Sequence, residues 1–249
     1  MEPPIKRIPG HLHPLSQMIA EITDIFSELG FSFAEGPEVE SEWYNFDALN
    51  VPKDHPARDM QDTFYIKNPW GEGKNRKEVL RTHTSPVQIR YMETHRPPIR
   101  IIVPGKVFRN EATDATHEAQ FYQLEGLMID KDVTLANLTG TLQYFAEKFF
   151  GGKVELRLRP SFFPFVEPGV EVAVKIEGDP SKNKLAGRWL EILGAGMVHP
   201  FVLKNAGIDS SKYQGFAFGA GIDRLAVLKY GIDDVRLLYN GDLRLINQF

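Results

Sequence analysis

The sequence contains no cysteine, which excludes disulfides, thiolate metal sites and a cysteine nucleophile. It also contains no run that approaches the roughly 18 apolar residues of a membrane-spanning helix. The N-terminal stretch MEPPIKRIPG lacks the apolar segment of a signal peptide. We therefore expect a soluble, cytoplasmic protein with no membrane partner.

Motifs that mark several common chemistries are missing too. The chain has no G-x-x-x-x-G-K-[ST] phosphate loop, no G-x-S-x-G nucleophile elbow and no H-E-x-x-H zinc motif. Its seven histidines form no i, i+4 pair, which argues against zinc. GAGIDR begins like a dinucleotide fingerprint, but Arg224 stands in place of the last glycine. A magnesium ion held by one or two carboxylates and by phosphate oxygens is still compatible with the sequence.

An excess of positive charge is also lacking. The 29 basic and 33 acidic residues give a net charge of −4, whereas proteins dominated by contacts to nucleic-acid phosphates are usually basic. If nucleic acid is a partner, we expect it to bind locally or to be held mainly by another subunit. The composition is otherwise that of a globular protein, and the length allows one large domain or two small ones. Because no interdomain linker stands out, we expect one domain over residues 1–249.

Two helices are indicated by their periodicity. Apolar residues at intervals of three and four predict an amphipathic helix from Pro14 to about Gly30 and a second one over residues 133–150. Core packing explains the first stripe better than a dimer interface does. FSFAEGPEVES (31–41) predicts a strand broken at Gly36, and residues 51–80 predict long loops with short strands.

Alternating apolar and polar residues dominate the second half of the chain. Runs such as VELRLR (154–159) predict antiparallel strands with one buried face. These strands cluster and do not alternate regularly with helices. The fold class is therefore α+β, with an antiparallel β-sheet flanked by helices.

FRNEATDATHEAQFYQLEG (108–126) joins two strand-like runs through a loop. On strands, Arg109 and Glu111 leave one face, as do Phe121, Gln123 and Glu125 on the returning run. Solvated cross-strand pairs are one explanation. A ligand site is the other, because Phe121 needs something to stack on it, and because the loop, without Gly or Pro, is too long for a tight turn.

A second arginine, in GFAFGAGIDRLAVLKYG (215–231), strengthens the ligand hypothesis. Its glycines thin the strand, and Arg224 falls in the first turn of the following helix. A cation is unfavourable at that end of a helix unless an anion binds beside it. RTHTSP (81–86) and FFPFVEPG (162–169) also place polar or aromatic residues on one face, although taken alone they fit a strand end and an edge strand.

Together these segments resemble a class II aminoacyl-tRNA synthetase core, and in particular the α subunit of bacterial-type phenylalanyl-tRNA synthetase. Residues 33–50, 108–126 and 215–231 resemble the three class II motifs in order. HPARDMQDTFY (55–65), LRTHTSP (80–86), FPFVEPG (163–169) and GAGMVHP (194–200) resemble segments peculiar to the phenylalanine enzyme. The resemblance runs from about Gly10 to the C-terminus and implies the class II catalytic fold.

The resemblance implies activation of phenylalanine by ATP and its transfer to the 3′ end of tRNA(Phe). In its terms, Arg109 holds the α-phosphate and the substrate carboxylate, and Arg224 holds the γ-phosphate. Phe121 stacks on adenine, Glu111 accepts from the adenine amino group, and His117 contacts the β- and γ-phosphates. These are the expected catalytic and ATP-binding residues.

The resemblance also assigns the amino-acid site. The ammonium group is gripped and oriented by polar side chains, the ring meets two phenylalanines, and a small residue forms the floor. These residues are, in that order, His83, Ser85, Gln123 and Glu125, then Phe163 and Phe165, then Ala217.

Glu167 resembles a Mg²⁺ ligand at a site shared with the β subunit, which is the implied partner in an α2β2 assembly. A homodimer through residues 14–46 is a further expected contact. The family carries an N-terminal coiled-coil arm that touches tRNA, and we expect this chain to lack it because no heptad run precedes the core.

Three other functions could use the same fold. A paralogue that forms an aminoacyl adenylate without charging tRNA would keep all three motifs. A non-catalytic interaction module on the same fold would have lost Arg109, Arg224 or Phe121, and all three are present. An enzyme for another amino acid is disfavoured because the phenylalanine-type segments are intact.

Overall fold

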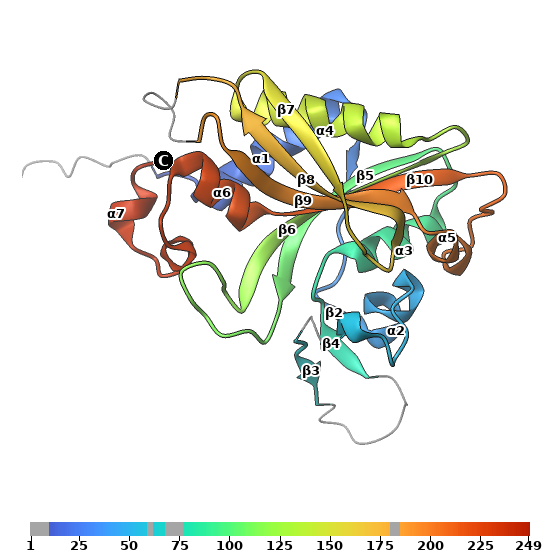
Figure 1. Ribbon diagram of the computed structural model, residues 1–249. Coiled ribbons are helices and arrows are strands. Elements are labelled where there is room, and N and C mark those ends of the chain that lie inside the picture. Colours follow the sequence, from blue (N-terminus) through green and yellow to red (C-terminus); the bar gives the residue numbers. More distant parts are fainter. Residues whose placement is uncertain (1–9, 59–61, 68–76, 180–184) are drawn as a thin grey trace, which may run out of the picture.

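A seven-stranded sheet organises the computed structural model, which describes residues 10–58, 62–67, 77–179 and 185–249 (Figure 1). The strand order is β1-β5-β6-β10-β9-β8-β7. The strands are β1 (Ser32–Phe33), β5 (Ile99–Phe108), β6 (Gln120–Asp130), β7 (Val154–Pro160), β8 (Val166–Ile176), β9 (Trp189–Val198) and β10 (Gln214–Gly221). All neighbours are antiparallel except β1 and β5, which are parallel. The expected α+β fold with an antiparallel sheet is confirmed, with this one exception.

Three helices cover one face of the sheet: α1 (Pro14–Glu28), α4 (Leu135–Phe150) and α6 (Ile222–Tyr230). The apolar stripe of α1 is buried, and Phe26 stacks on Phe145 of α4 and Phe218 of β10 at centroid distances of 5.1 and 5.2 Å. Core packing of the first predicted helix is therefore confirmed. Gly30 follows with φ of 78°, a conformation that suits glycine at a helix end.

The second predicted helix begins slightly later than expected, at Leu135. Thr134 caps it, because its side chain accepts from the backbone N–H of Asn137 while the Asn137 side chain accepts from the N–H of Thr134. This capping box holds Thr134 in an extended conformation, so the helix starts only after it.

The opposite face is covered over only part of its area. Helices α3 (Ser85–Thr94) and α5 (Pro200–Asn205) pack there, with α2 (Glu42–Asn45) and the 3-10 turn η1 (Asp47–Leu49) nearby. Leu127 and Ile129 of β6 are buried in this second core, while Phe121, Gln123 and Glu125 of the same strand point to the same face farther along. The N-terminal half of β6, with Phe121, Gln123 and Glu125, is thus available to form a ligand-binding site.

Two local expectations need correction. Helix α3 was not predicted, because RTHTSP fits a strand end, whereas Pro86 in its first turn is the usual start of a helix. Strand β5 ends at Phe108, so Arg109 and Glu111 lie beyond it and not on it. Arg109 is still tied to the hairpin, since its N–H donates to Ala119 O at 3.0 Å.

A second, small sheet contains β2 (Val39–Ser41), β4 (Glu78–Leu80) and β3 (Tyr65–Ile66), with η2 (Pro56–Arg58) in the same part of the chain. Strands β3 and β4 confirm the short strands expected within residues 51–80, and β2 belongs to the broken strand expected over residues 31–41. Residues 59–61 of the HPARDMQDTFY segment and residues 1–9 of the expected domain lie outside the described part. The chain ends with η3 (Val235–Leu238) and α7 (Leu243–Ile246). No helix within the described ranges has the length and apolar character of a membrane span.

Candidate active site

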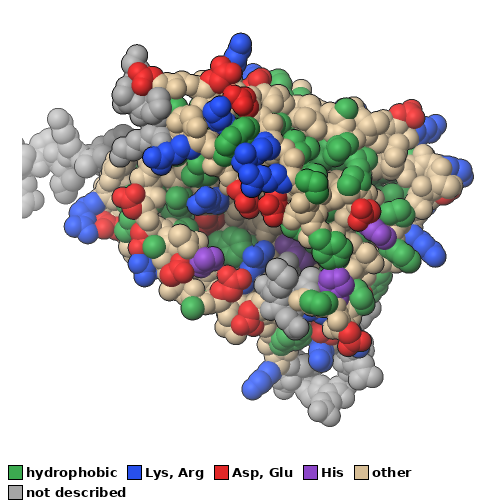
Figure 2. Space-filling view, in the orientation of Figure 1, with side chains coloured by type: hydrophobic (Ala, Val, Ile, Leu, Met, Phe, Trp, Pro, Cys, Tyr) green, Lys and Arg blue, Asp and Glu red, His purple; other side chains and the backbone are tan. Residues whose placement is uncertain are grey.

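A cavity of about 980 Å³ opens beside α3 over strands β6, β8, β9 and β10. Figure 2 shows this side of the molecule hollowed near its middle, with acidic, basic and histidine side chains around the hollow. The structure brings together most of the expected site residues. Lining the cavity are His83, Ser85, Arg109, Gln123, Glu125, Phe163, Phe165, Ala217 and Arg224, whereas Glu111, His117, Phe121 and Glu167 do not line it.

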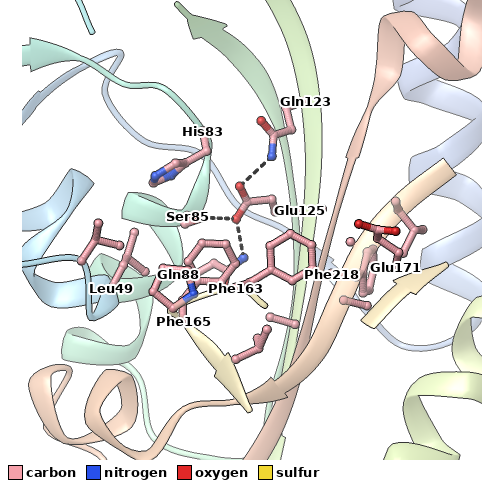
Figure 3. Close-up of a pocket in the computed structure, with 18 of the residues that line it drawn as sticks. Leu49, His83, Ser85, Gln88, Gln123, Glu125, Phe163, Phe165, Glu171 and Phe218 are labelled. Atoms are coloured by element: carbon pink, nitrogen blue, oxygen red, sulfur yellow. Dashed lines mark hydrogen bonds between the residues drawn. The ribbon is translucent and has the colours of Figure 1, made fainter. Parts of the chain in front are cut away.

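The carboxylate of Glu125 is the polar centre of the cavity (Figure 3). It accepts from the N–H of Thr84 at 3.1 Å, from Ser85 Oγ at 2.5 Å, from Gln88 Nε2 at 2.8 Å and from Gln123 Nε2 at 3.0 Å. Thr84 and Ser85 lie at the N-terminus of α3, where a negative charge is favoured. Burial nevertheless dominates and raises the pKa of Glu125 to about 7.

Two further polar atoms in the cavity are buried and have no partner among the described residues: His83 Nδ1 and Gln123 Oε1. Burial, with the positive charge of Arg109, lowers the pKa of His83 to about 3, so its ring is neutral. A neutral imidazole can present one ring nitrogen as an acceptor. Unpaired buried acceptors are costly, and a bound donor such as an ammonium group would satisfy them.

Aromatic side chains form the apolar part of the cavity. The rings of Phe163 and Phe165 lie with centroids 6.0 Å apart at an interplanar angle of 19°. Gly194 of β9 leaves room for Phe163, because a Cβ there would lie 2.9 Å from the ring. Ala217 lines the cavity from β10. This part is suited to a flat apolar side chain.

Arg109 lies between the cavity and Phe121. Its guanidinium carbon is 5.1 Å from the centre of the Phe121 ring, a cation–π contact, and its Nε donates to Thr82 O at 3.2 Å. One face of the half-buried Phe121 ring is therefore covered by Arg109. Burial lowers the pKa of Arg109, opposed by Glu111, but a guanidinium stays charged at neutral pH.

Arg224 lies where the sequence predicts it, in the first turn of α6 just after β10. Its side chain is exposed, not buried, and it forms no ion pair with any other described residue. An unpaired cation at a helix N-terminus is locally unfavourable, and an anion at the cavity mouth would relieve it. Among the glycines of β10, Gly219 lines the cavity, whereas Gly215 packs against the backbone of Met128.

The loop after β5 carries two expected nucleotide contacts, Glu111 and His117. His117 is exposed, and its Nδ1 lies 3.1 Å from Asp114, which also accepts from the backbone N–H groups of Thr116 and His117. These bonds hold the loop as a compact turn around Asp114. Because neither Glu111 nor His117 lines the cavity, their contacts with a nucleotide stay predictions.

The expected magnesium ligand, Glu167, is exposed and outside the cavity. Within the part of the chain that the structure describes, no group of three or more His, Cys, Asp or Glu side chains could hold a metal ion. A single carboxylate fits Mg²⁺ only where phosphate oxygens or another chain supply further ligands.

Several residues of the cavity were not predicted from the sequence. Gln88 binds Glu125 from one turn into α3, and it could have been found by recognising Ser85–Pro86 as a helix start, since i and i+3 share a face. Glu171 and Gly194 also line the cavity. Their contribution depends on the pairing of β8 with β9, where Glu171 lies opposite Gly194.

The arrangement places a carboxylate and unpaired acceptors next to aromatic rings, and two arginines, Arg109 and Arg224, line the same cavity. Such a site can bind an aromatic zwitterion beside a polyanion. An antiparallel sheet with these motifs is that of a class II synthetase core, and a family model described as "tRNA synthetases class II core domain (F)" matches residues 2–249.

The relatives narrow the class further. The chain is 56% identical over 243 residues to the phenylalanine–tRNA ligase alpha subunit of Dehalococcoides mccartyi, covering 96% of this chain and 70% of the relative. It is 55% identical over 247 residues to the phenylalanine–tRNA ligase alpha subunit of Clostridium perfringens, covering 98% of this chain and 70% of the relative. The chain therefore belongs to the phenylalanine–tRNA ligase alpha-subunit family of class II synthetases.

One solved structure agrees at the level of the fold. A pyrrolysyl-tRNA synthetase from Desulfitobacterium hafniense matches with a TM-score of 0.67 at 19% identity, over 96% of this chain and 76% of that one. At this identity the likeness shows the class II fold and no more.

Proposed function

We propose that this chain is the catalytic α subunit of a phenylalanine–tRNA ligase, which joins phenylalanine to tRNA(Phe) in two steps that use ATP. The observation that carries the proposal is the placement of the buried Glu125 carboxylate, with the free acceptors His83 Nδ1 and Gln123 Oε1, in the cavity that Phe163 and Phe165 line. The sequence similarity to alpha subunits supports the same substrate.

The amino acid is bound through both of its ends. The ammonium donates to Glu125 and to the acceptors of His83 and Gln123, and Ser85 orients the carboxylate of Glu125. The phenyl ring lies against Phe163 and Phe165, with Ala217 below. Aromatic contacts of this kind add to the burial of apolar area.

Adenylate formation needs placement of charge more than a protein nucleophile. The carboxylate oxygen of phenylalanine attacks the α-phosphorus, the bond to the bridging oxygen breaks, and pyrophosphate leaves with the electron pair. Arg109 neutralises charge on the α-phosphate and orients the carboxylate, while Arg224 holds the γ-phosphate. Phe121 stacks on adenine, Glu111 accepts from its amino group, and His117 reaches the β- and γ-phosphates.

In the second step a terminal ribose hydroxyl of tRNA attacks the activated carbonyl, and AMP leaves. Magnesium, when bound, neutralises phosphate charge, and Glu167 would supply a carboxylate to it together with the β subunit. We expect α2β2 assembly, and Phe33, Val39 and Trp43 offer exposed apolar surface within residues 14–46, the expected dimer segment. A cytoplasmic location stays a prediction.

Phenylalanine-dependent exchange of pyrophosphate into ATP tests the proposal, with the chain alone and with a β subunit, followed by charging of tRNA(Phe). We expect exchange with phenylalanine and much weaker exchange with tyrosine, since an apolar pocket rejects an added hydroxyl by about 10²-fold. Exchange that is absent with phenylalanine, even with β present, would overturn the proposal.

A further inference from the structure

A buried carboxylate stands beside Arg224 and has no part in the reaction described above. Asp223 is only 4% exposed. Its Oδ2 accepts from the backbone N–H of Tyr122 at 2.7 Å, and its Oδ1 accepts from the hydroxyl of Tyr239. Burial raises the pKa of Asp223 to about 6, while both donors act to lower it, so the group is largely an ionised acceptor at neutral pH.

The bond to Tyr122 lies at a break in the sheet. Strand β10 pairs with β6 up to Gly221, which lies opposite Gln123, and the chain then turns into α6. The next N–H of β6 on that side, that of Tyr122, would have no strand partner. The Asp223 carboxylate takes the partner's place, so the start of α6 is tied to the end of β6.

This bond therefore joins two elements that carry proposed nucleotide contacts. On β6, Tyr122 directly follows Phe121, and on α6, Asp223 directly precedes Arg224. Gln123 is held separately, by its pairing with Gly221 and by its bond to Glu125. A change at Asp223 should therefore affect the nucleotide side of the site more than the amino-acid side.

The C-terminal segment from Val235 to Tyr239 also links Asp223 to the loop between β5 and β6. Tyr239 follows η3, and within η3 the N–H of Val235 donates to Ala115 O at 2.9 Å, in the loop that carries His117. Leu238 O is also bound by His13 Nε2 at 2.9 Å, just before α1. The segment is thus anchored on both the nucleotide loop and the main core.

We propose that Asp223 and Tyr239 are positioning residues, which fix Arg224 and Phe121 relative to each other and so set the affinity for ATP. This inference rests on the proposed function, because that function assigns the nucleotide to Arg224 and Phe121. The carboxylate acts through its neighbours and does not touch the substrate.

The chemistry of the pair predicts a graded series of variants. Asp223→Ala leaves the Tyr122 N–H and the Tyr239 hydroxyl without an acceptor, and raises the KM for ATP about tenfold. Asp223→Asn keeps an amide oxygen for the Tyr122 N–H and retains most of the wild-type affinity. Tyr239→Phe removes one donor and gives a smaller increase than Asp223→Ala.

The test is the pyrophosphate-exchange reaction of the full chain assembled with a β subunit, with KM measured separately for ATP and phenylalanine. Asp242→Ala is the control, since Asp242 caps α7 in the same C-terminal segment by accepting from the N–H of Arg244. For Asp223→Ala we expect a higher KM for ATP and a KM for phenylalanine within about twofold of wild type. For Asp242→Ala we expect both constants to equal those of wild type.

Other results would overturn one proposal and leave the other. An unchanged KM for ATP in Asp223→Ala, or a parallel rise in both constants, would overturn the positioning role while an active wild type upholds the proposed function. A wild type inactive with phenylalanine would overturn the function. Calorimetric titration with ATP would then decide the positioning role, which tenfold weaker binding by Asp223→Ala would support and equal binding would exclude.

Discussion

At the scale of single residues, the site depends on one carboxylate held between opposing effects. Glu125 receives four hydrogen bonds, which favour its ionised form, yet its burial raises its pKa to about 7. A cation arriving beside it would strengthen the ionised form further. In the proposed function a substrate ammonium would complete an ion pair with Glu125, whose ionised form is costly to bury without that partner.

The cost predicts a pH-dependent stability difference for Glu125→Gln. The folded-state pKa of about 7 exceeds the unfolded value of 4.5, so the stability contributed by the protonated group is fully present below pH 4.5 and is lost as the pH rises through 7. Urea unfolding at pH 5 and pH 8 should show the variant gaining on wild type by roughly 2 kcal/mol at the higher pH. The control is Glu78→Gln, which removes an exposed carboxylate at the start of β4 and should show no such gain. A stability difference between Glu125→Gln and wild type that stays constant with pH would contradict the prediction.

The two arginines give a second prediction at this scale. Arg109→Ala and Arg224→Ala should each lower kcat/KM for pyrophosphate exchange by about tenfold or more, because each removes a preorganised positive charge from the triphosphate. Arg100→Ala, at the exposed far end of β5, is the matched control. Unchanged exchange in both site variants would show that the nucleotide lies elsewhere.

At the scale of elements, the cavity has room because Gly219 of β10, which has no side chain, lies beside Gln123 and Glu125 of β6. A Cβ on Gly219 would lie 3.2 Å from Gln123 Nε2 and 3.3 Å from Glu125 Cγ. These distances are tighter than ordinary contacts, so both amino-acid ligands would have to move by a few tenths of an ångström. The strand thus sets the positions of Gln123 and Glu125, the proposed ligands of the substrate ammonium.

Gly219→Ala should therefore raise the KM for phenylalanine by roughly tenfold, because small displacements of positioning groups are costly. The control is Gly140→Ala on α4, where a Cβ meets nothing within 4 Å. That variant should gain about 0.5–1 kcal/mol in the free energy of unfolding and keep its kinetics, since alanine is the better helix former. Equal KM values for the two variants would contradict the role assigned to β10.

The elements also show what the sequence could and could not predict. The stripe of α1 and the alternation of β7 and β8 are strong periodic signals, and all three elements were predicted from the sequence. Helix α3 was missed, because its buried face includes the polar residues Ser85 and Gln88 and so lacks a clear apolar stripe. The parallel pairing of the two-residue strand β1 with β5 was not predictable either, since it is fixed by the packing around it.

At the scale of the whole molecule, the cavity gathers side chains from distant parts of the chain. His83 lies just before α3 and Ser85 at its first position, while Phe163 lies before β8. Ala217 lies on β10 and Arg224 in the first turn of α6. Alternation along β6 correctly placed Gln123 and Glu125 on one face, whereas the strand expected at RTHTSP is the start of a helix. The family resemblance named the residues from distant segments that line the cavity together. No local pattern specified that Glu171 and Gly194 would line the cavity, because their places follow from the pairing of β8 with β9.

The charge of the whole chain leads to the last prediction. Its net charge is −4, and Figure 2 shows the basic and acidic side chains of the described residues intermingled on the face that holds the cavity. Affinity for tRNA comes largely from contacts of Lys and Arg with phosphates. Filter binding at about 150 mM salt should therefore show at least tenfold weaker binding of tRNA(Phe) by the chain alone than by the chain with a β subunit. Equal affinities would mean that this chain carries the tRNA-binding surface itself, in a basic region that the net charge conceals.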